Sequence, residues 1–236
     1  MARTLELEIA GIKKKILSFC AVVEENVRDA IKALVYRDTA LAAKVIDMDE
    51  EIDAMEVALE EDCLKTLALY QPVAKDLRFI IAVFNINNDL ERIGDLAVNI
   101  AERALSLAAC SEVDIPFDYT EMAEKVLSMV KNSLDSLVQM DPLLAQQVCD
   151  RDEEIDLINR QVYVRVQDRI RQYPERVDCL IQFPAISSEL ERIADHATNI
   201  AEEVIYLAKG EIVRHRPKNH KPHLKVVNSR TGPTSE

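Results

Sequence analysis

The sequence predicts an all-α protein that consists of two tandem three-helix bundles. Apolar residues recur every three or four positions over most of the 236 residues, which is the spacing of one face of an α-helix. The chain has four Gly and eight Pro, too few for the many turns of an all-β sandwich or barrel. Two segments of the first half also recur in the second half. A duplicated helical unit explains all three observations.

Three helices are expected in the first half, over residues 4–36, 39–70 and 73–109. Asp38 or Thr39 can cap the second helix, because a side-chain oxygen there can accept hydrogen bonds from free backbone N–H groups. In the third helix, residues 79–84 are apolar on all sides, so this stretch is expected in the middle of a bundle. Residues 110–120 contain Pro116 and are expected to form a linker.

The second half is expected to form three further helices, over residues 119–139, 142–173 and 175–209. Pro184 should bend the last helix, since proline removes one backbone hydrogen bond from the helical ladder. The regular spacing stops after Lys209. Seven Lys or Arg and two Glu follow from Lys209 onward, which predicts a basic, disordered tail.

The internal repeat is visible in two pairs of segments. DMDEEID at 47–53 matches DRDEEID at 150–156, and DLERIGDLAVNIAE at 89–102 matches ELERIADHATNIAE at 189–202. Chance similarity between amphipathic helices would explain the apolar positions but not the matched Arg, Asn and acidic residues. We therefore divide the chain into a first repeat, a second repeat and a basic tail, at residues 1–110, 119–215 and 216–236.

Composition excludes several classes of protein. The net charge of −13 disfavours nucleic-acid and anionic-lipid binding by the body of the protein. No nucleotide-binding glycine loop, HExxH or GxSxG motif is present. No apolar run approaches the roughly 20 residues of a membrane span, and the acidic N-terminus is unlike a signal peptide. The five cysteines are scattered and never in CxxC spacing, so they are expected to be small buried hydrophobic residues in a reducing cytoplasm.

Each repeat carries two pairs of acids spaced four residues apart, one pair on its second helix and one on its third. Residues four apart share a helix face, so neighbouring helices can present four carboxylates together. The eight acids are Asp49, Asp53, Glu91, Asp95, Asp152, Asp156, Glu191 and Asp195. In the first repeat the acidic stripe extends further, to Glu56, Glu60 and Glu102, with Asn88 and Asn99 beside it. In the second repeat Asn159 and Tyr163 replace the two outer glutamates.

A metal site is one interpretation of this stripe, and a solvated acidic face is the other. Like charges four residues apart cost a helix about 0.2–0.5 kcal/mol per pair, and a bound cation removes that cost. The duplication favours metal over a solvated face. Oxygen ligands suit hard or borderline ions such as magnesium, manganese, calcium or iron.

Catalysis is disfavoured by the residues that are missing. Di-iron carboxylate oxidases of the ferritin-like type use Glu-x-x-His, and this motif does not occur in the chain. His196 is the one histidine in the predicted helices, so neither a Ser/His/Asp nor a Cys/His set can be assembled, and His196 itself is expected at the surface or an interface. Arg92 and Arg192 should form salt bridges with the neighbouring acids. Asn99 and Asn199 either orient those acids or simply pack between helices.

At these residues the chain resembles the PhoU family of bacterial phosphate-transport regulators. The segments that carry the resemblance are QPVAKDLRFIIA at 71–82, NDLERIGDLAVNIAE at 88–102, SELERIADHATNIAEE at 188–203 and GEIVRH at 210–215. The resemblance implies duplicated three-helix bundles that bind iron or zinc through the paired acids. Asp49, Asp53, Glu91 and Asp95 would form the first site, and Asp152, Asp156, Glu191 and Asp195 the second. The tail from Arg216 onward departs from the family.

The family also implies a function without catalysis. Its members resemble adaptors that restrain phosphate uptake and phosphate-starvation signalling when phosphate is plentiful. The implied partners are the ATPase subunit of the phosphate ABC transporter, the phosphate sensor histidine kinase and a second copy of the chain in a homodimer. Two alternatives stay open at this point, a di-iron oxidase and a helical scaffold without metal.

Overall fold

The computed structural model describes residues 2–110 and 119–210, and every element in these ranges is a helix. This confirms the all-α prediction. In chain order the elements are α1 (Ala2–Tyr36), α2 (Thr39–Asp47), α3 (Asp49–Tyr70), α4 (Ala74–Ala108), α5 (Tyr119–Gln139), α6 (Pro142–Gln172), the 3-10 helix η1 (Pro174–Arg176), α7 (Val177–Leu180) and α8 (Gln182–Lys209). Most of the predicted linker and the whole predicted tail lie outside the described residues.

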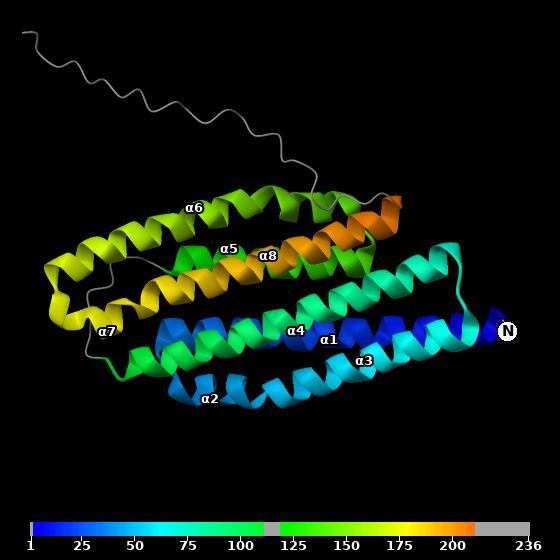
Figure 1. The fold of residues 1–236 in the computed structure, drawn as a ribbon, viewed down its shortest axis with the longest axis horizontal. Coiled ribbons are helices and arrows are strands. Elements are labelled where there is room, and N and C mark those ends of the chain that lie inside the picture. Colours follow the sequence, from blue (N-terminus) through cyan, green and yellow to red (C-terminus); the bar gives the residue numbers. More distant parts are fainter. Residues whose placement is uncertain (1, 111–118, 211–236) are drawn as a thin grey trace, which may run out of the picture.

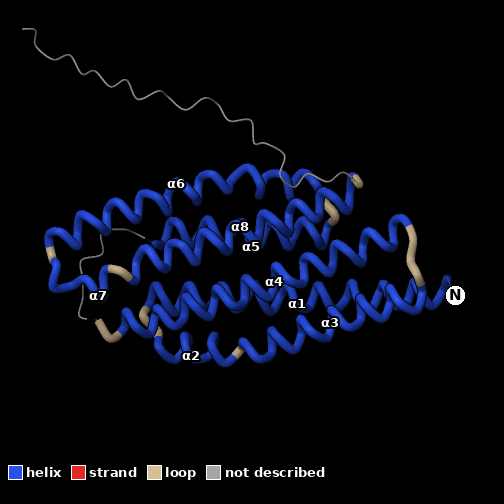
Figure 2. The backbone as a smooth tube through the Cα atoms, in the orientation of Figure 1, coloured by secondary structure: helices blue, strands red, loops and turns tan. Residues whose placement is uncertain are grey.

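The long helices run side by side along the length of the molecule (Figure 1). Helices α1 to α4 form the first repeat, and α5 to α8 with η1 form the second. The two repeats meet mainly where α4 packs against α8, with α1 and α5 also in contact. Figure 2 shows only short loops between the helices of the described chain. Helices α4 and α8 therefore lie where the two bundles meet.

Two predicted helices are broken in the structure. The predicted helix at 39–70 is interrupted at Met48, whose φ of −72° and ψ of −13° separate α2 from α3. The predicted helix at 175–209 is divided into η1, α7 and α8, with the last break at Ile181. Pro184 then lies in the first turn of α8, where a missing backbone N–H costs no hydrogen bond. The proline therefore follows a break instead of bending a continuous helix.

The same turn begins the second helix of both repeats. Arg37 and Met140 have left-handed φ values of 51° and 53°. The next residue caps the helix in each case: Asp38 accepts hydrogen bonds from Ala40 and Leu41 N–H groups, and Asp141 accepts them from Leu143 and Leu144. Of the two candidates for the first cap, the structure selects Asp38. The duplication thus extends to local backbone geometry.

The apolar run at 79–84 is only partly buried, which corrects the sequence prediction. Ile80, Ala82 and Val83 are fully buried between the helices. Ile81, however, is 41% exposed, so its side chain reaches solvent although its neighbours in sequence are buried. An unbroken apolar run does not fix burial on every face of a helix.

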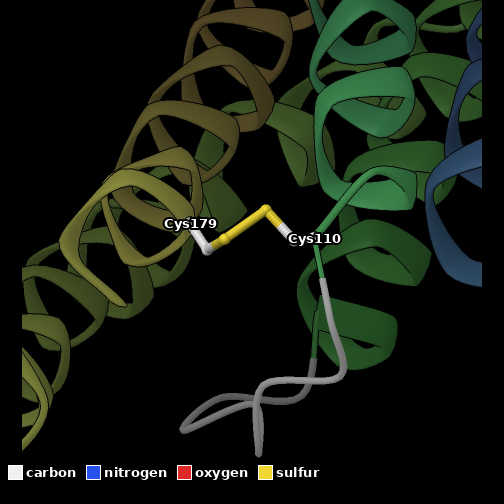
Figure 3. The surroundings of a disulfide bond; sticks show 2 residues. All are labelled: Cys110 and Cys179. Carbon is white, nitrogen blue, oxygen red and sulfur yellow. A yellow bond between two sulfur atoms is a disulfide. The ribbon is translucent and has the colours of Figure 1, made fainter. Parts of the chain in front are cut away.

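Two of the five cysteines are joined, which overturns the prediction that all five are buried hydrophobic residues. Cys110 and Cys179 form a disulfide with Cα atoms 6.3 Å apart (Figure 3). The other three, Cys20, Cys63 and Cys149, are free thiols. The pair was missed because 69 residues separate the two positions in sequence, and only the packing of the repeats brings them together.

Candidate metal centre

The first group of acids lies where α3 begins, directly after the break at Met48. Asp49 and Asp53 are one helical turn apart on α3 and face Asp95 on α4. One carboxylate oxygen from each of these three residues lies within 4.8 Å of the other two. Among the residues that the structure describes, this is the one set of three potential ligands that meets so closely. The structure therefore brings together three of the four acids predicted for the first site.

Gly94 allows the close approach of the two helices that carry these acids. A Cβ atom at this position would lie 2.9 Å from Cγ2 of the fully buried Ile52, well inside van der Waals contact. Gly94 and Ile52 each precede a predicted ligand, Asp95 and Asp53. Gly94 was not among the predicted site residues. The one signal for it in the sequence is that the second repeat has the buried Ala194 at the matching position.

Asp49 carries one carboxylate oxygen that is withdrawn from solvent. Its Oδ1 atom is buried and accepts no hydrogen bond from the described residues. Burial raises the pKa of Asp49 above its ordinary value, and repulsion from Asp53, Asp95 and Glu102 raises it further. A carboxylate oxygen that is buried without a donor, and close to other anions, is stabilised by a cation. The donor set and this oxygen fit a bound metal ion.

Glu91, the fourth acid predicted for the first site, forms a salt bridge with Arg92. Its Oε2 atom lies 3.3 Å from Nε of Arg92, whose Nη1 also lies 3.1 Å from Oδ2 of Asp95. Burial, followed by repulsion from Asp95, raises the pKa of Glu91, and Arg92 partly opposes the rise. The predicted salt bridges of Arg92 are confirmed. Arg92 therefore competes with a metal ion for Glu91 and Asp95.

The outer part of the first acidic stripe is held by an asparagine that the sequence analysis missed. Asn87 is buried, and its Nδ2 donates to the backbone oxygen of Glu56 at 3.0 Å and to Oε1 of Glu56 at 3.3 Å. Burial and the neighbouring Glu60 raise the pKa of Glu56. Asn87 thus fixes the distance between α3 and α4 one turn beyond the ligands.

The second group of acids lies on α6 and α8. Burial and repulsion from Asp152, Glu191 and Asp156 raise the pKa of Asp195 from 3.8 to about 6. The pKa of Glu191 is also raised, first by burial and then by Asp156 and Asp152. The four predicted acids of the second repeat are therefore electrostatic neighbours, although no three of them form a group as tight as the one on α3 and α4.

Asn159 and Tyr163, which replace the outer glutamates in the second repeat, bind serines of α8. Asn159 Oδ1 accepts a hydrogen bond from Ser187 Oγ at 2.7 Å, and Tyr163 OH lies 3.0 Å from Ser188 Oγ. Neutral hydrogen bonds therefore join α6 to α8 where the first repeat has acidic residues. The second site has fewer available carboxylates as a result.

Three polar residues of α8 bind partners outside the second group of acids. Arg192 Nη1 pairs with Glu189 at 3.3 Å, not with Glu191 or Asp195. Asn199 Nδ2 donates to Asp89 Oδ1 at 3.2 Å, so it does not orient a predicted ligand. His196 Nδ1 also lies 2.9 Å from that Asp89 oxygen. Because Asp89 belongs to α4, His196 and Asn199 lie at the interface between the repeats, one of the two places expected for His196.

None of the helices in the described ranges combines the length and the apolar character needed to cross a bilayer.

Known proteins share both the sequence pattern and this arrangement of helices. The family described as PhoU domain matches the chain twice, over residues 16–104 and 119–204. The phosphate-specific transport system accessory protein PhoU homolog of Pseudomonas putida is 36% identical over 218 residues, which cover 91% of this chain and 84% of the relative. The homolog of Aquifex aeolicus is 38% identical over 209 residues, covering 89% and 95%. The crystal structure of PhoU from Pseudomonas aeruginosa superimposes with a TM-score of 0.83 at 35% identity, covering 87% of this chain and 99% of that one.

Proposed function

The chain belongs to the PhoU family, and from this premise we propose that it is an accessory protein of a phosphate-specific transport system that restrains phosphate uptake and phosphate-starvation signalling. The observation that carries the proposal is the match of both repeats to relatives of that name along 91% of the chain. We further propose that it works in the cytoplasm, without catalysis, as an adaptor. Its partners would be the transporter's ATPase subunit, the phosphate sensor histidine kinase and a second copy of the chain.

Metal binding is the second part of the proposal. Asp49, Asp53 and Asp95 would hold an ion at the first site, with Glu91 completing the shell when it leaves Arg92. Asp152, Asp156, Glu191 and Asp195 would form a weaker second site. Iron, zinc, manganese and magnesium are the candidate ions. A bound ion would supply positive charge to an acidic face and so change the surface that a partner meets.

Deleting the gene tests the regulatory role. Phosphate-responsive promoters should become active in high phosphate, and a plasmid copy of the wild-type gene should silence them again. Unchanged promoter activity in the deletion strain would refute the role. Capture of the tagged protein from cells grown in high and low phosphate, followed by mass spectrometry, should recover the ATPase subunit and the sensor kinase.

The metal site is tested by replacing two of its ligands. Asp49→Asn/Asp53→Asn should lower the metal content of protein loaded with manganese and should stabilise the metal-free protein, because repulsion falls. Glu51→Gln/Glu61→Gln removes the same charge from exposed positions of α3 and should leave the metal content unchanged. Equal metal content in both variants would favour a scaffold with solvated acids. Oxygen-dependent turnover by iron-loaded protein would instead favour the oxidase alternative.

A further inference from the structure

The disulfide joins the two repeats at the end of the molecule where α4 finishes. Cys110 follows Ala109, the C-terminal cap of α4, and Cys179 lies in the short helix α7 of the second repeat. Both residues are half-buried, so a small thiol reagent can reach the bond. Figure 3 shows the two side chains bridging the space between the α4 end and α7. The bond is thus a second covalent connection between the repeats, in addition to the chain itself.

The other three cysteines lie in surroundings that suppress thiol chemistry. Burial raises the pKa of Cys20 and of Cys149 to about 12, and that of Cys63 to about 11. The reactive form of cysteine is the thiolate, so these residues stay inert near neutral pH. Thiol–disulfide exchange is therefore disfavoured at these three residues, and the pair Cys110 and Cys179 is already joined by a bond.

The disulfide joins the first repeat to a turn that packs mainly against its own repeat in the described part of the chain. Helix α7 packs against α6, η1 and α8, all of its own repeat. Residues 173–178 of this turn are exposed, and Leu180 is the residue of α7 that is fully buried. Gln182 and Glu189 of α8 accept hydrogen bonds from Arg103 of α4 at 3.4 and 3.3 Å. These links hold α8 and not the turn.

We propose that Cys110 and Cys179 are a reversible redox pair that fastens the turn between α6 and α8 to the end of α4. Oxidation proceeds by exchange with a low-molecular-weight disulfide: one protein thiolate attacks it and releases one thiol, and the second protein thiolate then displaces the other thiol from the mixed disulfide. Two protein thiols and one small disulfide become one protein disulfide and two small thiols. A dithiol reductant reverses the exchange. Proteins in a reducing compartment use disulfides mainly in this transient way.

The proposal is independent of the proposed role in phosphate transport, because neither cysteine is one of the eight acids or depends on a metal ion. It concerns the contact between the repeats, on which any partner that touches both of them would depend. Reduction frees the turn while leaving the apolar α4–α8 contact in place.

Thiol counting tests the bond itself. Full-length protein equilibrated with oxidised glutathione and then denatured should show three free thiols, and five after dithiothreitol. Returning the reduced protein to oxidised glutathione should restore three. Five thiols in the oxidised sample, or failure to re-form the bond, would overturn the proposal.

Limited trypsin digestion tests what the bond holds. Cleavage after the exposed Arg176 should be several-fold faster in reduced than in oxidised protein, because local opening controls cleavage. Cys110→Ser/Cys179→Ser should be cut at the fast rate with or without reductant. Cys149→Ser, which removes an unpaired cysteine, should respond to reductant as the wild type does. Equal cleavage rates in oxidised and reduced wild type would show that the bond does not fasten the turn.

Discussion

Single residues set the chemistry of the first acidic group. Asp49 has a buried carboxylate oxygen that accepts no hydrogen bond from the described residues. Gly94 has no side chain at the point where α4 touches α3. The buried oxygen of Asp49 favours a bound cation. The small size of Gly94 lets the two helices approach until their carboxylate oxygens can bind the same cation. Neither effect depends on the net charge of the protein.

Gly94→Ala should weaken the first site and destabilise the protein. The new methyl meets a β-branched side chain in the core, which costs about 1–3 kcal/mol, and this outweighs the gain of up to about 1 kcal/mol in helix propensity. Urea unfolding and manganese titration measure the two effects. Gly11→Ala is the matched control, because a Cβ on Gly11 meets nothing within 4 Å. It should stabilise the protein by about 0.5–1 kcal/mol. Stabilisation by both substitutions would contradict the proposed close contact.

Asp195 should make the stability of the metal-free protein depend on pH. Its folded pKa of about 6 is above the ordinary 3.8, so the folded state binds more protons than the unfolded state between these values. The free energy of unfolding should therefore fall as pH rises from about 4 to about 6 and then level off. The contribution is at most about 1 kcal/mol, because Asp195 is only partly withdrawn from solvent and the remaining solvent screens the repulsion. Asp195→Asn should flatten this part of a urea-unfolding series, and an unchanged slope would contradict the assignment.

Among the helices, the second helix of each repeat begins in the same way, but only the one in the second repeat is continuous. Asp38 and Asp141 cap the helices in the same way after a left-handed residue. In the first repeat that helix breaks at Met48, immediately before Asp49, and in the second repeat α6 continues unbroken through Asp152. Asp49 consequently begins a helix, while its counterpart Asp152 lies in the middle of one.

Removing either cap should destabilise the protein by about 1 kcal/mol, because two N–H groups at the helix start lose their acceptor. Asp38→Ala and Asp141→Ala test the two repeats separately, with the free energy of unfolding as the measurement. Asn is also a good N-cap, so Asp38→Asn and Asp141→Asn should retain most of the stability. A loss confined to one repeat would mean that the two turns are not energetically equivalent.

At the scale of the whole molecule, the repeats pack through α4 and α8, the helices that also carry half of the predicted ligands. The polar contacts across this interface differ at its two ends. Arg103 pairs with Glu189 at 3.3 Å, whereas Asp89 contacts His196 and Asn199. The two acidic groups are therefore parts of one rigid helical unit, and an ion bound at either one stabilises the folded chain.

Metal removal should lower the stability of the whole protein. Free manganese at about 100 times its dissociation constant should raise the free energy of unfolding by about 2.7 kcal/mol per site. Thermal unfolding with manganese, and again after EDTA, measures the difference. The Asp49→Asn/Asp53→Asn variant should retain only the stabilisation by manganese that is due to the second site. An EDTA effect of the same size in this variant would place the ion elsewhere.

The helical class, the duplication and the positions of the paired acids can all be read from the order of the residues. Helical spacing and the repeated motifs are local properties, so they can be recognised without coordinates. The same patterns placed most helix ends within a few residues of those observed. They could not show the breaks at Met48 and Ile181, since both lie inside continuous amphipathic patterns.

Which of the acids meet, and what the remaining polar residues contact, depends on the packing of the helices in three dimensions. The closeness of Asp49, Asp53 and Asp95 depends on how near α3 comes to α4, and this is set by the fit of Gly94 against Ile52. The disulfide likewise depends on how the two repeats dock. Such contacts join residues far apart in sequence, and their distances follow from side-chain packing, which a periodic pattern does not contain.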